Sequence, residues 1–288
     1  MIDRLVLCTS ESFALGTAVA LASFRARNPW FAGESIVFAE HLGEEARNQI
    51  KAAGAATIRT PGPELVDRLD ALCAARPDLA ARRGRFLSLA AFALKGEGRV
   101  LFLDSDVVVT ADFSELIAHE GELLVAPDSA SLRGERREAT TFLPTDRKDD
   151  AVSGFNAGMM VIGSGLRCGD AYSNLVDRLR PESWDGVKSG HTDQLLLNRM
   201  FGERATHVSP RYNLMVGHHA RGFARAPVAA SEVAMFHFNG PVKPWDTPGM
   251  ARAALADPLV HHAWSKWQQA LREMIAANHL SGIGPRDA

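Results

Sequence analysis

The sequence contains few cysteines, no surplus of charge of one sign and no long apolar segment. Its three cysteines, Cys8, Cys73 and Cys168, are widely spaced, which excludes a disulfide framework and a CxxC metal site. The formal net charge is −2, from 32 basic and 34 acidic residues. This balance creates no global field that would attract nucleic acid. Any phosphate-binding site must therefore be local, and we expect no nucleic-acid partner.

Neither a membrane span nor a secretion signal stands out near the start of the chain. The most apolar early stretch, residues 13–24, contains Gly16, Thr17 and Ser23 and is too short to cross a bilayer. The opening MIDRLVLCTS lacks the basic region of a secretion signal. Together with the low cysteine count, these features predict a cytoplasmic protein.

The composition, 46% hydrophobic and 23% charged over 288 residues, is typical of a globular protein with one large α/β domain. In the first 125 residues, short apolar runs alternate with stretches of helical spacing. The runs predict strands at 5–8, 35–40, 56–59, 99–104 and 122–127. The intervening helices are expected at 13–26, 43–53, 64–75 and 85–95. Buried strands that alternate with helices build a parallel sheet, so we predict a nucleotide-binding α/β topology.

A polar stretch from about 128 to 153 interrupts this alternation. It is dense in charge and turn formers, and is either a functional loop, such as a lid over a donor, or a disordered insertion. Regular patterns then return, with strands at 155–163 and 233–238 and helices at 169–180 and 192–201.

The last pattern is an amphipathic helix at 257–277. Its apolar stripe consists of Leu259, Trp264, Trp267, Leu271 and Ile275. We expect this stripe to pack on the rest of the protein, with peripheral contact to a membrane surface as the alternative.

The sharpest local pattern is LFLDSDVVV at residues 101–109, a buried strand that ends in two carboxylates one residue apart. Ligands of open α/β sheets bind beyond the carboxyl ends of the strands. Positions i and i+2 of an extended chain point to one side, so Asp104 and Asp106 can approach one hard cation. Such a cation would bridge the phosphates of a nucleotide diphosphate. Two aspartates that only cap a turn and face solvent are the alternative.

A second chemical pattern is FHFNGPVKPW at residues 236–245. The neutral imidazole of His237 can complete the coordination of a divalent ion, and the ammonium of Lys243 can neutralise phosphate charge. Gly240 would let backbone amides approach the phosphates. A lone histidine in an apolar run is more often a core residue, so the prediction of a binding site depends on the whole segment and not on His237 alone.

Five segments, in this order, resemble the motif series of glycosyltransferase family 8. They are DSD at 104–106, FNAGMMVI at 155–162, TDQLLLN at 192–198, SPRYN at 209–213 and HFNGPVKPW at 237–245. The resemblance spans residues 4–250, and the last segment matches the family pattern HFxGxxKPW at every specified position. It implies a GT-A fold, with a Rossmann-like mixed, mainly parallel sheet flanked by helices. We expect a glycosyltransferase domain at 1–250 and a packed helical extension at 251–288.

The resemblance also implies roles for individual residues. Asp104, Asp106 and His237 would ligate Mn²⁺, or alternatively Mg²⁺. Asp193 and Gln194 would stand beside the transferred sugar as catalytic residues. The donor-binding residues implied are Thr9, Ser10, Arg85, Ser105, Asn156, Ala157, Gly240 and Lys243. The turn CTSES departs from the family pattern, which commonly has an Asp or Asn where uracil and ribose bind, so a member that binds without turnover is one alternative.

The implied activity is retaining transfer of a hexose from a UDP-sugar to a hydroxyl of a carbohydrate or glycolipid acceptor. A haloacid-dehalogenase-type phosphatase is the enzymatic alternative, because LFLDSDVVVT also fits its hhhhDxDxxxT motif. In that class the motif stands near the start of the domain, whereas here it lies on the fourth predicted strand. The only Lys-Asp-Asp run, at 148–150, falls in the polar stretch.

Overall fold

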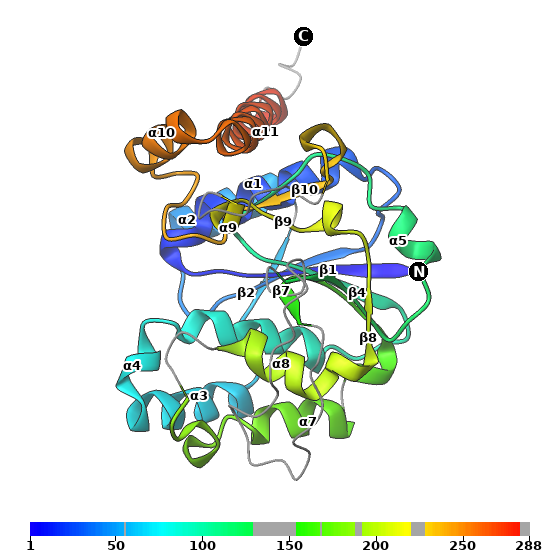
Figure 1. Cartoon of the computed structure of the whole chain (residues 1–288), viewed down its shortest axis with the longest axis vertical. Helices are drawn as coiled ribbons and strands as arrows, with labels where there is room; N and C mark the ends of the chain where they lie inside the picture. Colours follow the sequence, from blue (N-terminus) through cyan, green and yellow to red (C-terminus); the bar gives the residue numbers. More distant parts are fainter. Residues whose placement is uncertain (55, 129–153, 168, 188–191, 220–227, 283–288) are drawn as a thin grey trace.

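The computed structural model describes residues 1–54, 56–128, 154–167, 169–187, 192–219 and 228–282, and two sheets form its framework (Figure 1). The main sheet has the strand order β3-β2-β1-β4-β7-β6-β8. Its strands are β1 (Ile2–Cys8), β2 (Glu34–Phe38), β3 (Thr57–Arg59), β4 (Arg99–Leu103), β6 (Leu123–Pro127), β7 (Phe155–Ile162) and β8 (Ala205–His207). A small second sheet joins β5 (Val107–Val109), β10 (Met235–His237) and β9 (Leu214–Met215).

The predicted mixed, mainly parallel sheet is confirmed. The pairs β3/β2, β2/β1, β1/β4 and β6/β8 are parallel, whereas β7 lies antiparallel between β4 and β6. Strand β7 is buried at every position, as an interior strand covered on both faces must be.

Helices cover both faces of the main sheet (Figure 1). One face carries α1 (Ala14–Arg27) and α2 (Glu44–Gly54). The other carries α3 (Pro63–Ala75), α4 (Pro77–Ala80), α7 (Gly169–Asp177) and α8 (Asp193–Phe201). Helix α3 begins with Pro63, whose fixed φ suits a first helical turn, and buries Leu65, Leu69 and Leu72 at helical spacing. The remaining short elements are α5 (Glu115–Ala118), α9 (Val216–His219), η1 (Glu11–Phe13), η4 (Ser164–Leu166), η5 (Pro181–Trp184), η6 (Gly202–Arg204), η7 (Pro210–Tyr212) and η8 (Ala230–Glu232).

The α-helix expected at 85–95 is instead a 3₁₀ segment, η2 (Arg83–Ala93). Every residue from Phe86 to Phe92 is buried, so these apolar residues fill the core and do not mark one face of a surface helix. The short strands β5, β8 and β9 were not predicted, because two or three residues show no readable periodicity. Residues 129–153, which make up almost all of the polar stretch, lie outside the described residues. Whether this stretch forms a lid stays a prediction.

Two helices end the chain, α10 (Thr247–Ala256) and α11 (Pro258–Gly282). The buried residues of α11 recur every three or four positions: Val260, Ala263, Trp267, Ala270 and Met274. They pack with residues of α1, β5 and β10 in one apolar cluster. The predicted stripe is therefore slightly misplaced, since Ile275 is 46% exposed. Among the described residues, no helix has both the length and the apolar character needed to cross a membrane.

The topology brings four chain segments to one edge of the main sheet. Strands β1 and β4 are parallel and end there, at Cys8 and Leu103. Because β7 is antiparallel to β4, its first residues lie at the same edge, and Asp104 N–H donates to Gly158 O at 3.0 Å. In the second sheet, His237 pairs with Val107, next to Asp106.

Candidate functional site

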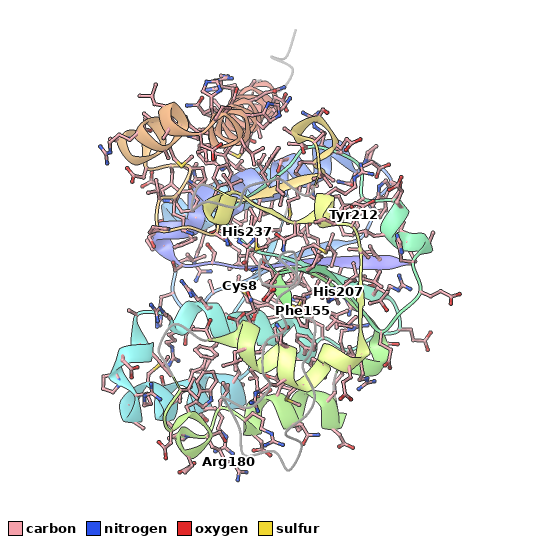
Figure 2. The ribbon with its side chains drawn as sticks, in the orientation of Figure 1. Cys8, Phe155, Arg180, His207, Tyr212 and His237 are labelled. Carbon is pink, nitrogen blue, oxygen red and sulfur yellow. The ribbon has the colours of Figure 1, made fainter. Side chains whose placement is uncertain are left out.

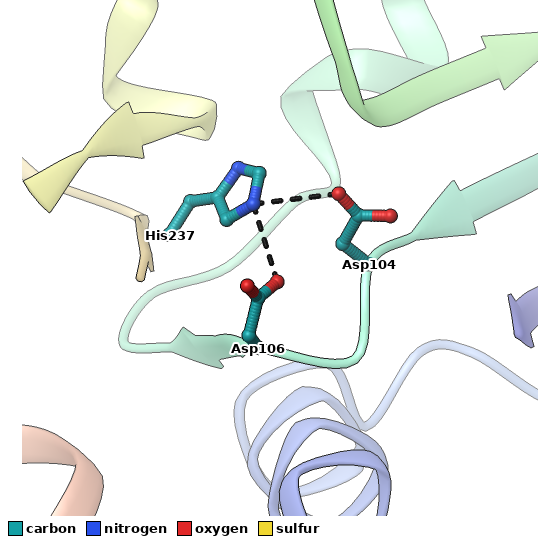
Figure 3. Close-up of side chains that lie close together, drawn as sticks. All are labelled: Asp104, Asp106 and His237. Atoms are coloured by element: carbon teal, nitrogen blue, oxygen red, sulfur yellow. Dashed lines mark ion pairs between the residues drawn. The ribbon is translucent and has the colours of Figure 1, made fainter. Parts of the chain in front are cut away.

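Three side chains from two distant segments converge at this edge (Figure 3). Nε2 of His237 lies 3.3 Å from Oδ2 of Asp104 and 3.2 Å from Oδ1 of Asp106. One ligand atom from each residue falls within 4.8 Å of the others. Two carboxylate oxygens and one imidazole nitrogen suit a divalent ion such as Mn²⁺. These residues can therefore hold a metal ion, as the sequence predicts.

The backbone fixes these three positions tightly. Phe238 N–H donates to Asp106 O at 2.8 Å, which ties the end of β10 to the DSD turn. Gly158 lies against the imidazole, because an added Cβ there would stand 2.3 Å from Cε1 of His237. A side chain at this position of β7 would occupy the space of the ring.

Lys243 is the positive charge beside this cluster. Its Nζ donates to Oδ2 of Asp106 at 2.5 Å and to Phe238 O at 2.9 Å. Burial alone would raise the pKa of Asp106, but His237 and Lys243 reverse this effect and lower its pKa overall. Asp106 is therefore ionised and ready to bind a cation. Burial followed by the charges of Asp106 and Asp193 raises the pKa of Asp104, against the opposing effect of His237.

A second group of side chains lies next to Asp104. Asp193, at the start of α8, is buried and accepts a hydrogen bond from the Ser88 hydroxyl at 2.7 Å. Cys8 ends β1 near the middle of the molecule (Figure 2). Burial, then the negative charges of Asp104 and Asp193, raises the pKa of its thiol. The carboxylates of Asp104 and Asp193 and the thiol of Cys8 therefore share one neighbourhood.

Fold comparison identifies solved enzymes of similar architecture. Galactosyltransferase LgtC, solved with donor and acceptor sugar analogues, gives a TM-score of 0.65 at 20% identity, over 93% of this chain and 99% of that chain. The apo form of glycosyltransferase GlyE from Streptococcus pneumoniae TIGR4 gives 0.61 at 17% identity, over 96% of this chain and 64% of that chain. At such identities the likeness is one of fold, and that fold is GT-A.

Sequence comparison decides the family. Curated GlyE of Streptococcus pneumoniae serotype 4 (strain ATCC BAA-334 / TIGR4) is 26% identical over 123 residues, which are 42% of this chain and 26% of GlyE, about a quarter of that relative. The model of glycosyl transferase family 8 matches residues 4–248, nearly the whole chain. The chain belongs to glycosyltransferase family 8. Family membership decides against the phosphatase alternative, whose run at 148–150 lies outside the described residues.

In this member of glycosyltransferase family 8, the residues predicted around the sugar adjoin the cluster of Asp104, Asp106 and His237. Nδ2 of Asn156 donates to Oε1 of Gln194 at 2.9 Å, and Ala157 follows in β7 with 5% exposure. Gly240 is buried against Gly217, where an added Cβ would lie 2.4 Å from Gly240 N. Close packing of these two segments thus requires glycine at Gly217, which was not predicted, whereas an approach of phosphates to Gly240 stays a prediction.

The predicted nucleotide-binding turn leads through η1 into α1. The hydroxyl oxygen of Thr17 in α1 lies 2.7 Å from that of Thr9 and 2.8 Å from that of Ser105. The Ser105 hydroxyl also donates to Cys8 O. Thr9 and Ser105 therefore connect β1 to the DSD turn from inside, whereas Ser10 is exposed. Their contacts with a nucleotide stay predictions.

Arg85 is exposed at the start of η2. Burial raises the pKa of Asp193, and the hydrogen bond from Ser88 and, more weakly, the positive charge of Arg85 oppose this effect. A direct contact with donor phosphates or sugar stays a prediction. Ser88 and Asn213 were not predicted as site residues. Ser88 is the one polar residue in the apolar run from Phe86 to Ala93, and that contrast was a usable signal. Asn213 ends the SPRYN motif, to which no role had been given.

Proposed function

We propose that this glycosyltransferase transfers a hexose from a UDP-sugar, with retention at the anomeric carbon, to a hydroxyl of a carbohydrate or glycolipid acceptor. The observation that carries the proposal is the convergence of Asp104, Asp106 and His237. A divalent ion held by these residues, Mn²⁺ or Mg²⁺, would neutralise charge on the departing diphosphate.

Lys243 supplies the second positive charge of the proposed site. Its ammonium group now contacts Asp106, one of the proposed metal ligands, and so lies where the diphosphate would bind. A lysine beside a leaving group stabilises the charge that develops in the transition state. Gly240 and the backbone after it would form the floor of the phosphate site.

The side chains near the proposed sugar position favour front-face substitution. Asp193 already accepts a hydrogen bond from Ser88, and the next two residues are Gln194 and Leu195, which carry no carboxylate. We therefore propose no covalent intermediate on the protein. The acceptor hydroxyl would attack from the side of the leaving group, and an oxygen of the diphosphate would take its proton.

The first prediction concerns the metal ligands. We expect Asp106→Ala and His237→Ala to lower UDP release from UDP-glucose or UDP-galactose at least about 100-fold, because stabilisation of a leaving group by a metal contributes several kcal/mol. EDTA should abolish UDP release by the wild type, and Mn²⁺ should restore it. NMR of the product would then report the configuration of the new bond.

Matched controls are available on the surface. Asp177→Asn removes a half-exposed carboxylate that pairs with Arg68, and His261→Ala removes an exposed imidazole on α11. Both should retain activity, because surface ion pairs contribute only about 0–1 kcal/mol. Full activity in either ligand variant would refute the metal assignment. Binding of UDP-sugar by the wild type without any UDP release would favour an inactive family member.

A further inference from the structure

A continuous chain of hydrogen bonds leads from His237 to Gln194. Nδ1 of His237 lies 2.9 Å from Oδ1 of Asn213. Nδ2 of Asn213 donates to Oδ1 of Asn156 at 2.8 Å, and Nδ2 of Asn156 donates to Oε1 of Gln194 at 2.9 Å. Asn213 is 1% exposed, His237 2% and Asn156 7%, so water does not compete for these bonds.

The backbone N–H of Gly158 determines which group donates and which accepts in each of these hydrogen bonds. Gly158 N–H, which can only donate, points at the side chain of Asn156 over 2.9 Å. The atom that it meets must therefore be the amide oxygen of Asn156. The atom of Asn213 that contacts the same oxygen must be its amino group, which turns the oxygen of Asn213 toward His237.

This direction decides which nitrogen of His237 carries hydrogen. The oxygen of Asn213 can only accept, so Nδ1 of His237 must be the donor. In the neutral ring, Nε2 then has the free lone pair, and Nε2 is the atom that faces Asp104 and Asp106. Asn213 thus selects the tautomer that can bind a metal ion.

At the Gln194 end of this chain of hydrogen bonds, the orientation of the Asn156 amide also fixes that of the Gln194 amide. Asn156 uses its amino group to donate to the oxygen of Gln194, so the amino group of Gln194 is turned away from Asn156. The side chain of Gln194 therefore has one preferred amide orientation, set from the second sheet of the molecule. A flip of Asn213 would bring its oxygen against that of Asn156, because Gly158 N–H holds the oxygen of Asn156 in place.

We propose that Asn213 is a positioning residue that sets the tautomer of His237 and, together with Gly158 N–H, holds Asn156 in the orientation that directs the amide of Gln194. One hydrogen-bond chain thereby links the metal site to the donor-sugar site. This inference rests on the proposed function for the roles of His237 and Gln194. The orientation of the amides itself depends only on the contacts of the folded chain.

Three substitutions distinguish the effect of Asn213 on His237 from its effect, through Asn156, on Gln194. Asn213→Asp still accepts from Nδ1 of His237, but its carboxylate cannot donate to Asn156. Asn156→Asp still accepts from Gly158 and Asn213, but cannot donate to Gln194. Asn213→Leu has a similar volume and removes both interactions. A thermal melt of each variant, compared with wild type, monitors its folding.

The readouts are Mn²⁺ binding, followed by EPR of the free ion with and without UDP, and kcat for UDP release from the sugar donor. Asn213→Leu should weaken Mn²⁺ binding by about 10–100-fold, as loss of a group that orients a metal ligand does elsewhere. Asn213→Asp and Asn156→Asp should bind Mn²⁺ as tightly as wild type, yet show a kcat lowered about tenfold or more.

A third readout reports the Nδ1 proton without metal or substrate. In ¹⁵N-histidine NMR of the metal-free protein, His237 should carry a hydrogen-bonded, slowly exchanging proton on Nδ1 in wild type and Asn156→Asp, because Nδ1 faces the oxygen of Asn213. In Asn213→Leu this proton should exchange rapidly. Wild-type Mn²⁺ binding by Asn213→Leu would overturn the inference, as would a parallel loss of Mn²⁺ binding and kcat in all three variants that follows their melting temperatures. If wild type shows the Nδ1-protonated ring but neither binds Mn²⁺ nor releases UDP, the proposed function fails while the positioning role of Asn213 stands.

Discussion

At the residue scale, the candidate site depends on glycines that leave room for functional side chains. Gly158 is the clearest case, because it carries both the N–H that orients Asn156 and the empty space that the ring of His237 fills. An alanine Cβ there would lie 2.3 Å from Cε1 and 2.6 Å from Nδ1 of His237. Since β7 is fully buried, the ring rather than the strand would have to move.

We therefore expect Gly158→Ala to weaken Mn²⁺ binding by about tenfold or more, because the displaced ring can no longer face both aspartates. Isothermal titration with Mn²⁺ measures this effect. Gly84→Ala is the matched control, since its Cβ meets nothing within 4 Å. Normal Mn²⁺ affinity in folded Gly158→Ala would show that His237 is not held in the position described.

At the element scale, α11 packs through a narrow seam of residues. Trp267 is 2% exposed and lies in the cluster that joins α11 to α1 and to the second sheet, whereas Ile275 on the same helix is 46% exposed. Trp264 lies beside the seam, and its Nε1 donates to Pro244 O at 2.9 Å, next to Lys243. Helix α11 thus supports the segment that carries the proposed phosphate-binding residues.

Trp267→Ala should destabilise the protein by about 3–5 kcal/mol, as expected for loss of a buried tryptophan. Ile275→Ala should change stability by less than about 0.5 kcal/mol, because nearly half of Ile275 is already exposed to solvent. Urea denaturation of both variants tests the pair. Equal effects would mean that the helix packs through another face, or that its outer face is covered by a partner or membrane.

At the scale of the whole molecule, the site is assembled from segments that are distant in the chain. Asp104 and Asp106 follow β4, Asn156 is the second residue of β7, Asp193 begins α8 and His237 ends β10. None of these segments can hold the metal cluster alone. Ligand binding is therefore coupled to the folding of the entire unit.

This coupling predicts that Mn²⁺ and UDP together stabilise the protein by about 2.7 kcal/mol when the limiting ligand is at 100 times its dissociation constant. The melting temperature should rise by several degrees in differential scanning fluorimetry. Asp106→Ala should show no such rise with Mn²⁺ and UDP. A rise of the same size in that variant would place the ion elsewhere.

The sequence alone determined the α/β class, the order of most strands and helices, and the residue types of the metal cluster. These features are local or follow from short motifs: buried strands are continuous apolar runs, and the DSD and HFNGPVKPW segments carry their own chemistry. The residues matched by the family model, 4–248, include these motifs.

Only the tertiary structure decided how these pieces meet. The antiparallel direction of β7 places Asn156 and Gly158 beside Asp104, and the second sheet places Asn213 between His237 and Asn156. Pairing direction and hydrogen bonds across 24 or 57 positions leave no periodic pattern in the chain. They depend on backbone groups that come together only when the core packs, which is why the role of Asn213 emerged from the fold and not from its motif.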